Sequence, residues 1–150
     1  MIRFAIERYD TCADEIDALA IEHGNEVQPH GGAFKVDPDL EAWRQLDHLN
    51  VLNTVTARDG PLLVGYALSI VMPHLQFKGV KWASGDGVWL SRAWRRPRVI
   101  DRLLDCAEDS LRARSVILNV IGVHPGHPAL GRILARRGYA LTSLGHSRRL

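Results

Sequence analysis

Cationic side chains gather in one short stretch of the sequence, between a predicted strand and a predicted helix. Arginine binds phosphate through paired hydrogen bonds, and the first turn of a helix also attracts anions. The stretch is either a turn that binds the phosphates of a nucleotide cofactor, a nucleic-acid contact, or a solvated surface without a ligand. Its arginines are Arg92, Arg95, Arg96, Arg98 and Arg102.

Two other residues are candidates for removing a proton from a substrate. Asp86 lies between Gly85 and Gly87, and it is either a general base or a turn residue that bonds to nearby backbone. His74 follows Pro73 at the predicted end of a strand. An imidazole titrates near neutral pH, so His74 is either a base or an exposed loop histidine.

Three residues nearer the N-terminus are candidates for contacting a substrate. Glu26 and His30 lie in a predicted loop rich in glycine and proline, where they either contact an amine or stay solvated. Trp43 lies on the apolar stripe of a predicted helix, as part of the core or of a pocket wall. His124 and His127 lie in a Pro-rich turn, but two ligands alone do not make a metal site, and no metal is predicted.

The elements that must position these residues follow from hydrophobic periodicity and turn signals. The clearest signal is a hairpin at Asp59–Gly60, with an apolar run on each side. Glycines inside the following strand indicate a bulge or a close backbone approach. Before the hairpin we expect a strand over 2–9 and then a helix over 11–23, which Thr11 caps and which ends at Gly24. A second helix is expected to begin at Pro38, with Asp37 as its cap.

The second half alternates strands and helices. The predicted order is a strand over 80–91, a helix opened by Pro97, a central strand over 115–123 buried on both faces, a helix over 127–138 ending at Gly138, and one or two short strands to the end. The sequence therefore predicts an α/β protein of the α+β type, with a mixed, mostly antiparallel sheet of about 6–7 strands flanked by about four helices.

The composition predicts one domain over residues 1–150, with a formal net charge of only +2. Arginines concentrate in the second half, which favours a ligand that carries phosphate. Cys12 and Cys106 are expected to be buried core residues rather than a disulfide. The charged N-terminal strand predicts no signal peptide, and no run is long enough to span a bilayer. We expect a cytoplasmic protein with no membrane partner, as a monomer or homodimer.

This order of elements resembles the GNAT superfamily of N-acetyltransferases over nearly the whole chain. The resemblance rests on "ARDGPLLVGYAL" (Ala57–Leu68), the strand–turn–helix from Asp86 to Glu108, and "LARRGYAL" (Leu134–Leu141). It is most similar to a phage-type branch with a "DPD…W" helix, a "PH" pair and a "D…L" strand. That branch would place the chain in the cytoplasm of a phage host.

The resemblance implies that acetyl-CoA is the cofactor and that an amine is the acceptor. The pantetheine arm would pair with the backbone of Val88, Trp89 and Leu90, and the pyrophosphate would lie at the start of the next helix. The turn of the family usually carries glycines, whereas this loop reads Arg95-Arg96-Pro97-Arg98-Val99-Ile100. We therefore expect the side chains of Arg95, Arg96 and Arg98, together with Val99, to bind the cofactor.

A second departure concerns the acid that protonates the leaving thiolate. Many members of the family carry a tyrosine there, and this chain has Leu134. The leading hypothesis is an N-acyltransferase that acts on a protein, a small molecule or a modified nucleobase, with DNA or a host protein as a candidate partner. Asp86 or His74 would be the base, and Glu26, His30 and Trp43 would contact the acceptor. The alternative is an inactive protein of the same fold, in a virion or bound to nucleic acid.

Overall fold

The structure is a computed structural model that describes residues 1–27 and 35–148. Its sheet has five strands in the order β1-β2-β3-β4-β5. All neighbouring strands are antiparallel except β4 and β5, which run parallel. The mixed, mostly antiparallel sheet is confirmed. The strands are β1 (Ile2–Ile6), β2 (Leu52–Asp59), β3 (Leu62–Pro73), β4 (Lys81–Leu90) and β5 (Leu118–Ile121).

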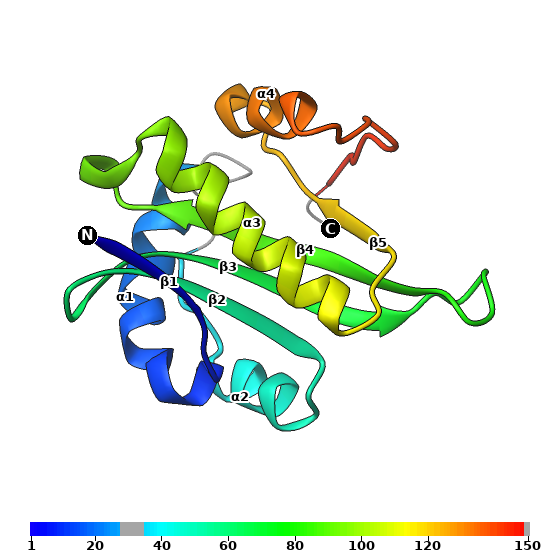
Figure 1. Cartoon of the computed structure of the whole chain (residues 1–150), viewed down its shortest axis with the longest axis horizontal. Helices are drawn as coiled ribbons and strands as arrows, with labels where there is room; N and C mark the ends of the chain where they lie inside the picture. The colour runs from blue at the N-terminus through cyan, green and yellow to red at the C-terminus, as the bar shows by residue number, and fades with distance from the viewer. Residues whose placement is uncertain (28–34, 149–150) are drawn as a thin grey trace.

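Helices cover both faces of this sheet, and four α-helices lie within the described residues (Figure 1). Two of them, α1 and α2, pack on one face, and α3 packs on the other. A short 3-10 turn at Arg92–Trp94 leads from β4 into α3. The helices are α1 (Tyr9–Val27), α2 (Leu40–His48), α3 (Pro97–Ala113) and α4 (Pro128–Arg136).

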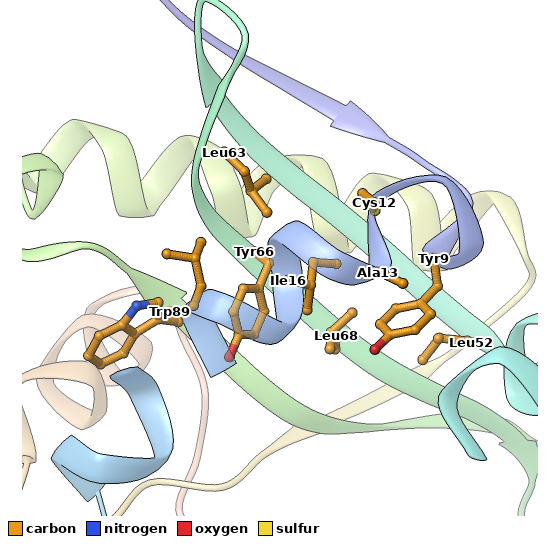
Figure 2. Packing of buried hydrophobic residues seen from close by; sticks show 10 residues of the cluster. Tyr9, Cys12, Ala13, Ile16, Leu52, Leu63, Tyr66, Leu68 and Trp89 are labelled. Atoms are coloured by element: carbon orange, nitrogen blue, oxygen red, sulfur yellow. The ribbon is translucent and has the colours of Figure 1, made fainter. Parts of the chain in front are cut away.

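The larger part of the core lies between α1 and the sheet (Figure 2). Ile16 of α1 lies next to Tyr66 of β3 in this cluster, with Trp89 toward one end of it and Cys12 toward the other. A second cluster lies under α3 and is built from alternate residues of the same strands, with Leu103 at its centre. Successive side chains of a strand point to opposite faces, so Trp89 faces α1 while Val88 and Leu90 face α3.

Helix α4 is attached mainly through charged side chains. Of its residues, only Leu134 is buried. Arg136 donates to Asp101 at 2.9 Å, and Arg137 donates to Asp105 at 2.7 Å and to Glu108 at 2.9 Å. These ion pairs therefore hold α4 against α3.

Several sequence-based boundaries were wrong for identifiable reasons. Helix α1 begins at Tyr9, before Thr11, and continues past Gly24 to Val27. Gly24 serves packing, because a Cβ there would lie 2.5 Å from the Val36 side chain. Helix α2 begins at Leu40, because Asp39 rather than Asp37 caps it by accepting from the Ala42 amide.

The second half also differs from expectation at the sheet edge. β5 is not central but lies at the edge of the described sheet, with Ile117 and Leu118 exposed. The described residues after Gly138 form no strand, and Leu141 and Leu144 stay exposed there. The sheet therefore has five strands in the described chain, fewer than the 6–7 predicted. No helix among the described residues is long and apolar enough to cross a membrane.

The cysteine prediction is confirmed for Cys12, which is buried, while Cys106 is only half-buried; both are free thiols. Burial raises the pKa of Cys12 to about 12, so it stays a protonated core residue near neutral pH.

Candidate active site

A bulge in β4 places Asp86 outside the regular ladder. Leu68 of β3 pairs with Gly87 and Ser69 pairs with Gly85, so Asp86 is the extra residue between them. Both glycines are tightly surrounded: a Cβ at Gly85 would lie 3.2 Å from the Val120 carbonyl oxygen. The bulge predicted from the glycines is thus confirmed, and it turns the Asp86 side chain out of the ladder.

Strands β4 and β5 part immediately before this bulge. They pair only from Trp82–Gly85 to Leu118–Ile121. Beyond Gly85, β4 continues to Leu90 with β3 on one side and, within the described residues, no strand on the other. The backbone of Val88 and Trp89 thus forms an open strand edge next to Asp86, which can pair with an extended ligand.

The Asp86 carboxyl has no hydrogen bond or ion pair with the residues that the structure describes. Although solvent reaches the residue, surrounding protein partly buries the carboxyl, and this burial raises its pKa. Its negative charge in turn contributes to the raised pKa of Tyr66, after the larger effect of burial. Asp86 is therefore a carboxylate that lacks a cation, close to a phenol.

Tyr66 belongs to a polar pair that the sequence analysis missed. The His23 Nδ1 atom lies 2.9 Å from the Tyr66 hydroxyl oxygen. The His23 ring also stacks on Trp89, with centroids 4.8 Å apart and an interplanar angle of 18°. Burial lowers the pKa of His23, with a smaller opposing effect from Glu26. A histidine on the otherwise apolar face of the first predicted helix was the available signal.

Glu26 holds two arginines of the cationic turn. Arg95 donates to the two Glu26 carboxylate oxygens at 2.7 and 3.0 Å, and Arg92 donates at 3.3 Å. Arg95 also donates to the Leu90 carbonyl oxygen at 2.7 Å and lies over the Trp89 ring at 4.2 Å. Hydrogen bonds from Arg95 are the main cause of the lowered pKa of Glu26. In this structure Glu26 contacts arginines, and Arg95 has protein partners.

Arg96 and Arg98 differ from Arg95. Both are exposed, and in the described part of the chain neither has an ion pair or a hydrogen bond from its side chain. They flank the start of α3, whose N-cap residue, Arg96, offers no side-chain hydrogen bond. The first turn of α3 contains no acidic residue. Val99 is half-buried against the core under α3. The start of α3 is thus positively charged and uncapped, which suits an anion.

The other predicted site residues lie apart from this cluster. His74 packs on Phe77 and Trp82 within the β3–β4 hairpin. Its amide pairs with Val80, and Asp86 lies more than about 15 Å farther along β4 at 3.3 Å per residue. The structure therefore does not bring His74 and Asp86 together.

Trp43 packs against Tyr9, with ring centroids 5.9 Å apart, as part of the α1-side core. His30 lies outside the described residues. His124 and His127 face each other with centroids 5.6 Å apart, and the described residues contain no group of three potential metal ligands.

Comparison with known proteins shows the fold. No family model matches the sequence, and no curated protein sequence matches it. Solved structures do match: a ribosomal-protein-alanine N-acetyltransferase from Brucella melitensis biovar Abortus 2308 has a TM-score of 0.76 at 16% identity, covering 99% of both chains. AAC(6')-Iy, in complex with the bisubstrate analogue CoA-S-monomethyl-acetylneamine, has a TM-score of 0.74 at 12% identity, covering 100% of this chain and 98% of that one.

A transcriptional regulator from Bacillus halodurans C-125 has a TM-score of 0.77 at 18% identity and covers 100% of this chain and 99% of its own. These likenesses confirm the expected GNAT-type fold. At such low identity they show the fold alone.

Proposed function

We propose that this chain transfers an acetyl group from acetyl-CoA to a primary amine. The observation that carries the proposal is the parting of β4 from β5 beside Asp86, followed by the cationic start of α3. Asp86, the open edge of Val88 and Trp89, and the start of α3 follow one another along the chain, which supports a site for an extended anionic ligand. Proteins that share the fold include an N-acetyltransferase and a protein bound to a CoA-containing bisubstrate analogue.

The residues of this stretch fit acetyl-CoA. The open edge at Val88 and Trp89 suits the amide groups of the pantetheine arm. Arg96 and Arg98, exposed at the start of α3, suit the pyrophosphate and replace the backbone contacts that glycines give. Val99 would line the same turn. When bound, acetyl-CoA supplies an acetyl thioester that is already activated for transfer.

Asp86 would bind and deprotonate the acceptor. A primary amine is protonated near neutral pH, and the unpaired carboxylate of Asp86 attracts the ammonium group. Although the residue is exposed overall, surrounding protein raises the pKa of the Asp86 carboxyl, which makes the carboxylate a stronger base than an ordinary aspartate. His74 lies in the β3–β4 hairpin beyond this region, so Asp86 is the base that we propose.

The leaving thiolate would depart without help from the usual tyrosine. Leu134 occupies that position and is buried. The nearby Tyr139 hydroxyl is engaged by Asn119 at 2.9 Å and by Glu108 at 3.2 Å. A thiolate is a tolerable leaving group, so solvent can protonate it.

The acceptor follows from the chemistry only as far as a primary amine. A protein, a small molecule and a modified nucleobase remain candidates, and the phage-type origin remains a prediction. The cytoplasm is the expected compartment, because acetyl-CoA is found there.

Thermal unfolding with acetyl-CoA tests the cofactor. A ligand at about 100 times its Kd adds roughly 2.7 kcal/mol to the free energy of unfolding and raises Tm. The shift should be clear for the wild type and fall to about half or less in the Arg96→Ala, Arg98→Ala double variant. Absence of any shift at millimolar acetyl-CoA would contradict the proposal.

The exposed arginines of the turn also favour a second candidate, a nucleic-acid-binding protein of this fold. Arg92 keeps 81% of its side chain exposed beside Arg96 and Arg98. Binding of a DNA duplex that falls steeply with added salt, without any response to acetyl-CoA, would support that alternative.

A further inference from the structure

We propose that His23 is a second proton-handling residue of this site, held in place by the Tyr66 hydroxyl and by the stack of Trp89 on Arg95. This inference rests on the proposed function, because it assigns a role in the same reaction. It adds a residue from α1 to a site otherwise built from β4 and the start of α3.

The reaction removes two protons from the nitrogen of the acceptor. A primary ammonium must lose one proton before its nitrogen can attack, and the nitrogen loses a second proton as the amide forms. The new bond joins nitrogen to the acetyl carbon, and the bond that breaks joins this carbon to sulfur. One of the two protons ends on the thiolate and the other in solvent. A single carboxylate at Asp86 can hold only one of them at a time.

The His23 ring packs beside the β4 backbone at the bulge. A Cβ at Gly87 would lie 3.3 Å from His23 Cε1 and 3.2 Å from Tyr66 Cε2, so the imidazole edge packs against the residue that follows Asp86. The Tyr66 hydroxyl engages Nδ1 at 2.9 Å. If Nδ1 carries the hydrogen and donates it to the Tyr66 oxygen, Nε2 presents a lone pair that can accept a proton.

Burial of the His23 ring keeps it neutral until a proton arrives. Burial lowers the pKa of His23, Glu26 acts in the opposite direction, and Arg95 adds to the lowering. Asp86 also lies near this group, since its charge contributes to the raised pKa of Tyr66. The imidazole is therefore unprotonated near pH 7, which is the state that a base requires.

The stack supplies the orientation. The Trp89 ring contacts both the His23 ring, with centroids 4.8 Å apart, and the Arg95 guanidinium, whose carbon lies 4.2 Å from the ring centroid. The indole Nε1 atom is buried and has no hydrogen-bond partner in the described residues, so these ring contacts rather than a hydrogen bond orient the indole. Glu26 and the Leu90 carbonyl fix Arg95. Arg95 and Glu26 are thus positioning residues, which act on His23 through Trp89.

The kinetic test compares His23→Asn and Tyr66→Phe with Glu22→Gln, an exposed position on the same helix that serves as the control. Each protein receives acetyl-CoA with a peptide amine, a polyamine or an aminoglycoside, and thiol release and the acetylated amine are measured from pH 5 to 9. We expect His23→Asn to lower kcat/KM by about 100-fold and to remove one ionisation from its pH profile. Tyr66→Phe should lower it by about tenfold, and Glu22→Gln should leave it unchanged.

Imidazole NMR gives a readout that needs no turnover. In the wild type, the His23 ring signals should titrate at a pH below the ordinary histidine pKa of 6.5 and shift when CoA is added, while those of His74 should not move with CoA. An active wild type whose His23→Asn variant keeps its rate and pH profile would overturn this inference and leave the proposed function intact. His23 signals that ignore bound CoA would also overturn it. A wild type that neither binds acetyl-CoA nor releases thiol would overturn both.

Discussion

Two clusters of arginine and glutamate in this molecule have opposite charge balance. In the first, Arg58 donates to Glu7 at 2.9 and 3.1 Å, to Glu15 at 2.9 and 2.6 Å, and to the Pro61 carbonyl at 3.1 Å. One guanidinium thus meets two carboxylates, giving a formal charge of −1. Its donors are all engaged, and only 11% of the Arg58 side chain is exposed.

In the second cluster, two guanidiniums share the single carboxylate of Glu26, giving a formal charge of +1. Arg96 and Arg98 follow directly and add two more positive charges without a described partner. An arginine whose donors are all engaged cannot bind a ligand, so Arg58 has a structural role. Its partners come from the end of β1, from α1 and from the β2–β3 hairpin, and the first cluster therefore holds these three elements together. The second cluster keeps positive charge available for an anion. The number of carboxylates per guanidinium, rather than the number of arginines, separates the two roles.

The largest expected effect separates the clusters by stability. Arg58→Met leaves Glu7 and Glu15 facing each other without a cation, and we expect it to lower the free energy of unfolding by about 3 kcal/mol. Arg95→Met should lower it by only about 1 kcal/mol, because the Arg95 side chain is 36% exposed, against 11% for Arg58. Urea denaturation of both variants measures the difference. Equal losses would contradict the distinction.

The acid limb of the stability curve provides a control for this prediction. Arg58 lowers the pKa of Glu7 and of Glu15. Their contribution to stability is therefore present above the ordinary glutamate pKa of 4.5 and lost as the pH falls through the lowered folded values. Arg58→Met should lose most of this dependence.

The next effect concerns Asp86, whose carboxyl makes no hydrogen bond or ion pair with the described residues of either cluster. We expect Asp86→Asn to lower the acetyl-transfer rate by about 100-fold, or about 2.7 kcal/mol. Because burial raises its folded pKa, ionised Asp86 costs stability once the pH exceeds the unfolded value of 3.8, so the amide should leave Tm unchanged or raised at pH 7. A variant that loses both activity and stability would instead mark Asp86 as structural.

A smaller effect distinguishes the free arginines from the fixed ones. The Arg96→Ala, Arg98→Ala double variant should weaken acetyl-CoA binding by about tenfold or more and change the stability of the free protein by less than about 0.5 kcal/mol. Calorimetric titration at low and high salt measures the binding. Arg92→Ala provides the comparison within the same turn. Unchanged affinity of the double variant for acetyl-CoA would show that Arg96 and Arg98 do not bind this cofactor.

The smallest effect is expected at Gly87. A methyl group there would meet Tyr66 at 3.2 Å and His23 at 3.3 Å, so Gly87→Ala forces both rings to move by a few tenths of an ångström. We expect the free energy of unfolding to fall by about 1 kcal/mol and the NMR signal of the His23 ring to shift. Gly126→Ala, which would meet only the exposed His124, serves as the matched control.

The sequence predicted those features that local patterns encode. The Asp59–Gly60 turn, the glycine-flanked bulge at Asp86 and the helix opened by Pro97 all depend on residues close together in the chain. The exposed cationic start of α3 was visible for the same reason. Helix starts were less certain, because Asp37 and Asp39 are both chemically suitable caps and only the fold selects Asp39.

The parts that were missed depend on contacts between distant residues. His23 and Tyr66 are 43 residues apart, and Glu26 and Arg95 are 69 apart. No local pattern pairs them, so Glu26 was expected in a loop and His23 was not singled out. β5 was misjudged because its apolar run resembles that of a central strand, whereas the described sheet ends there.

The bulge at Asp86 has a consequence for how such a site can arise. Gly85 and Gly87 pair with adjacent residues of β3, so removing Asp86 would leave every other β3–β4 pair in register. The carboxylate therefore stands in the strand as a one-residue insertion, which a single added codon can supply where glycines already flank the position. The same codon can be lost without disrupting the sheet, so a lineage with this fold can gain or abandon the carboxylate while its scaffold persists.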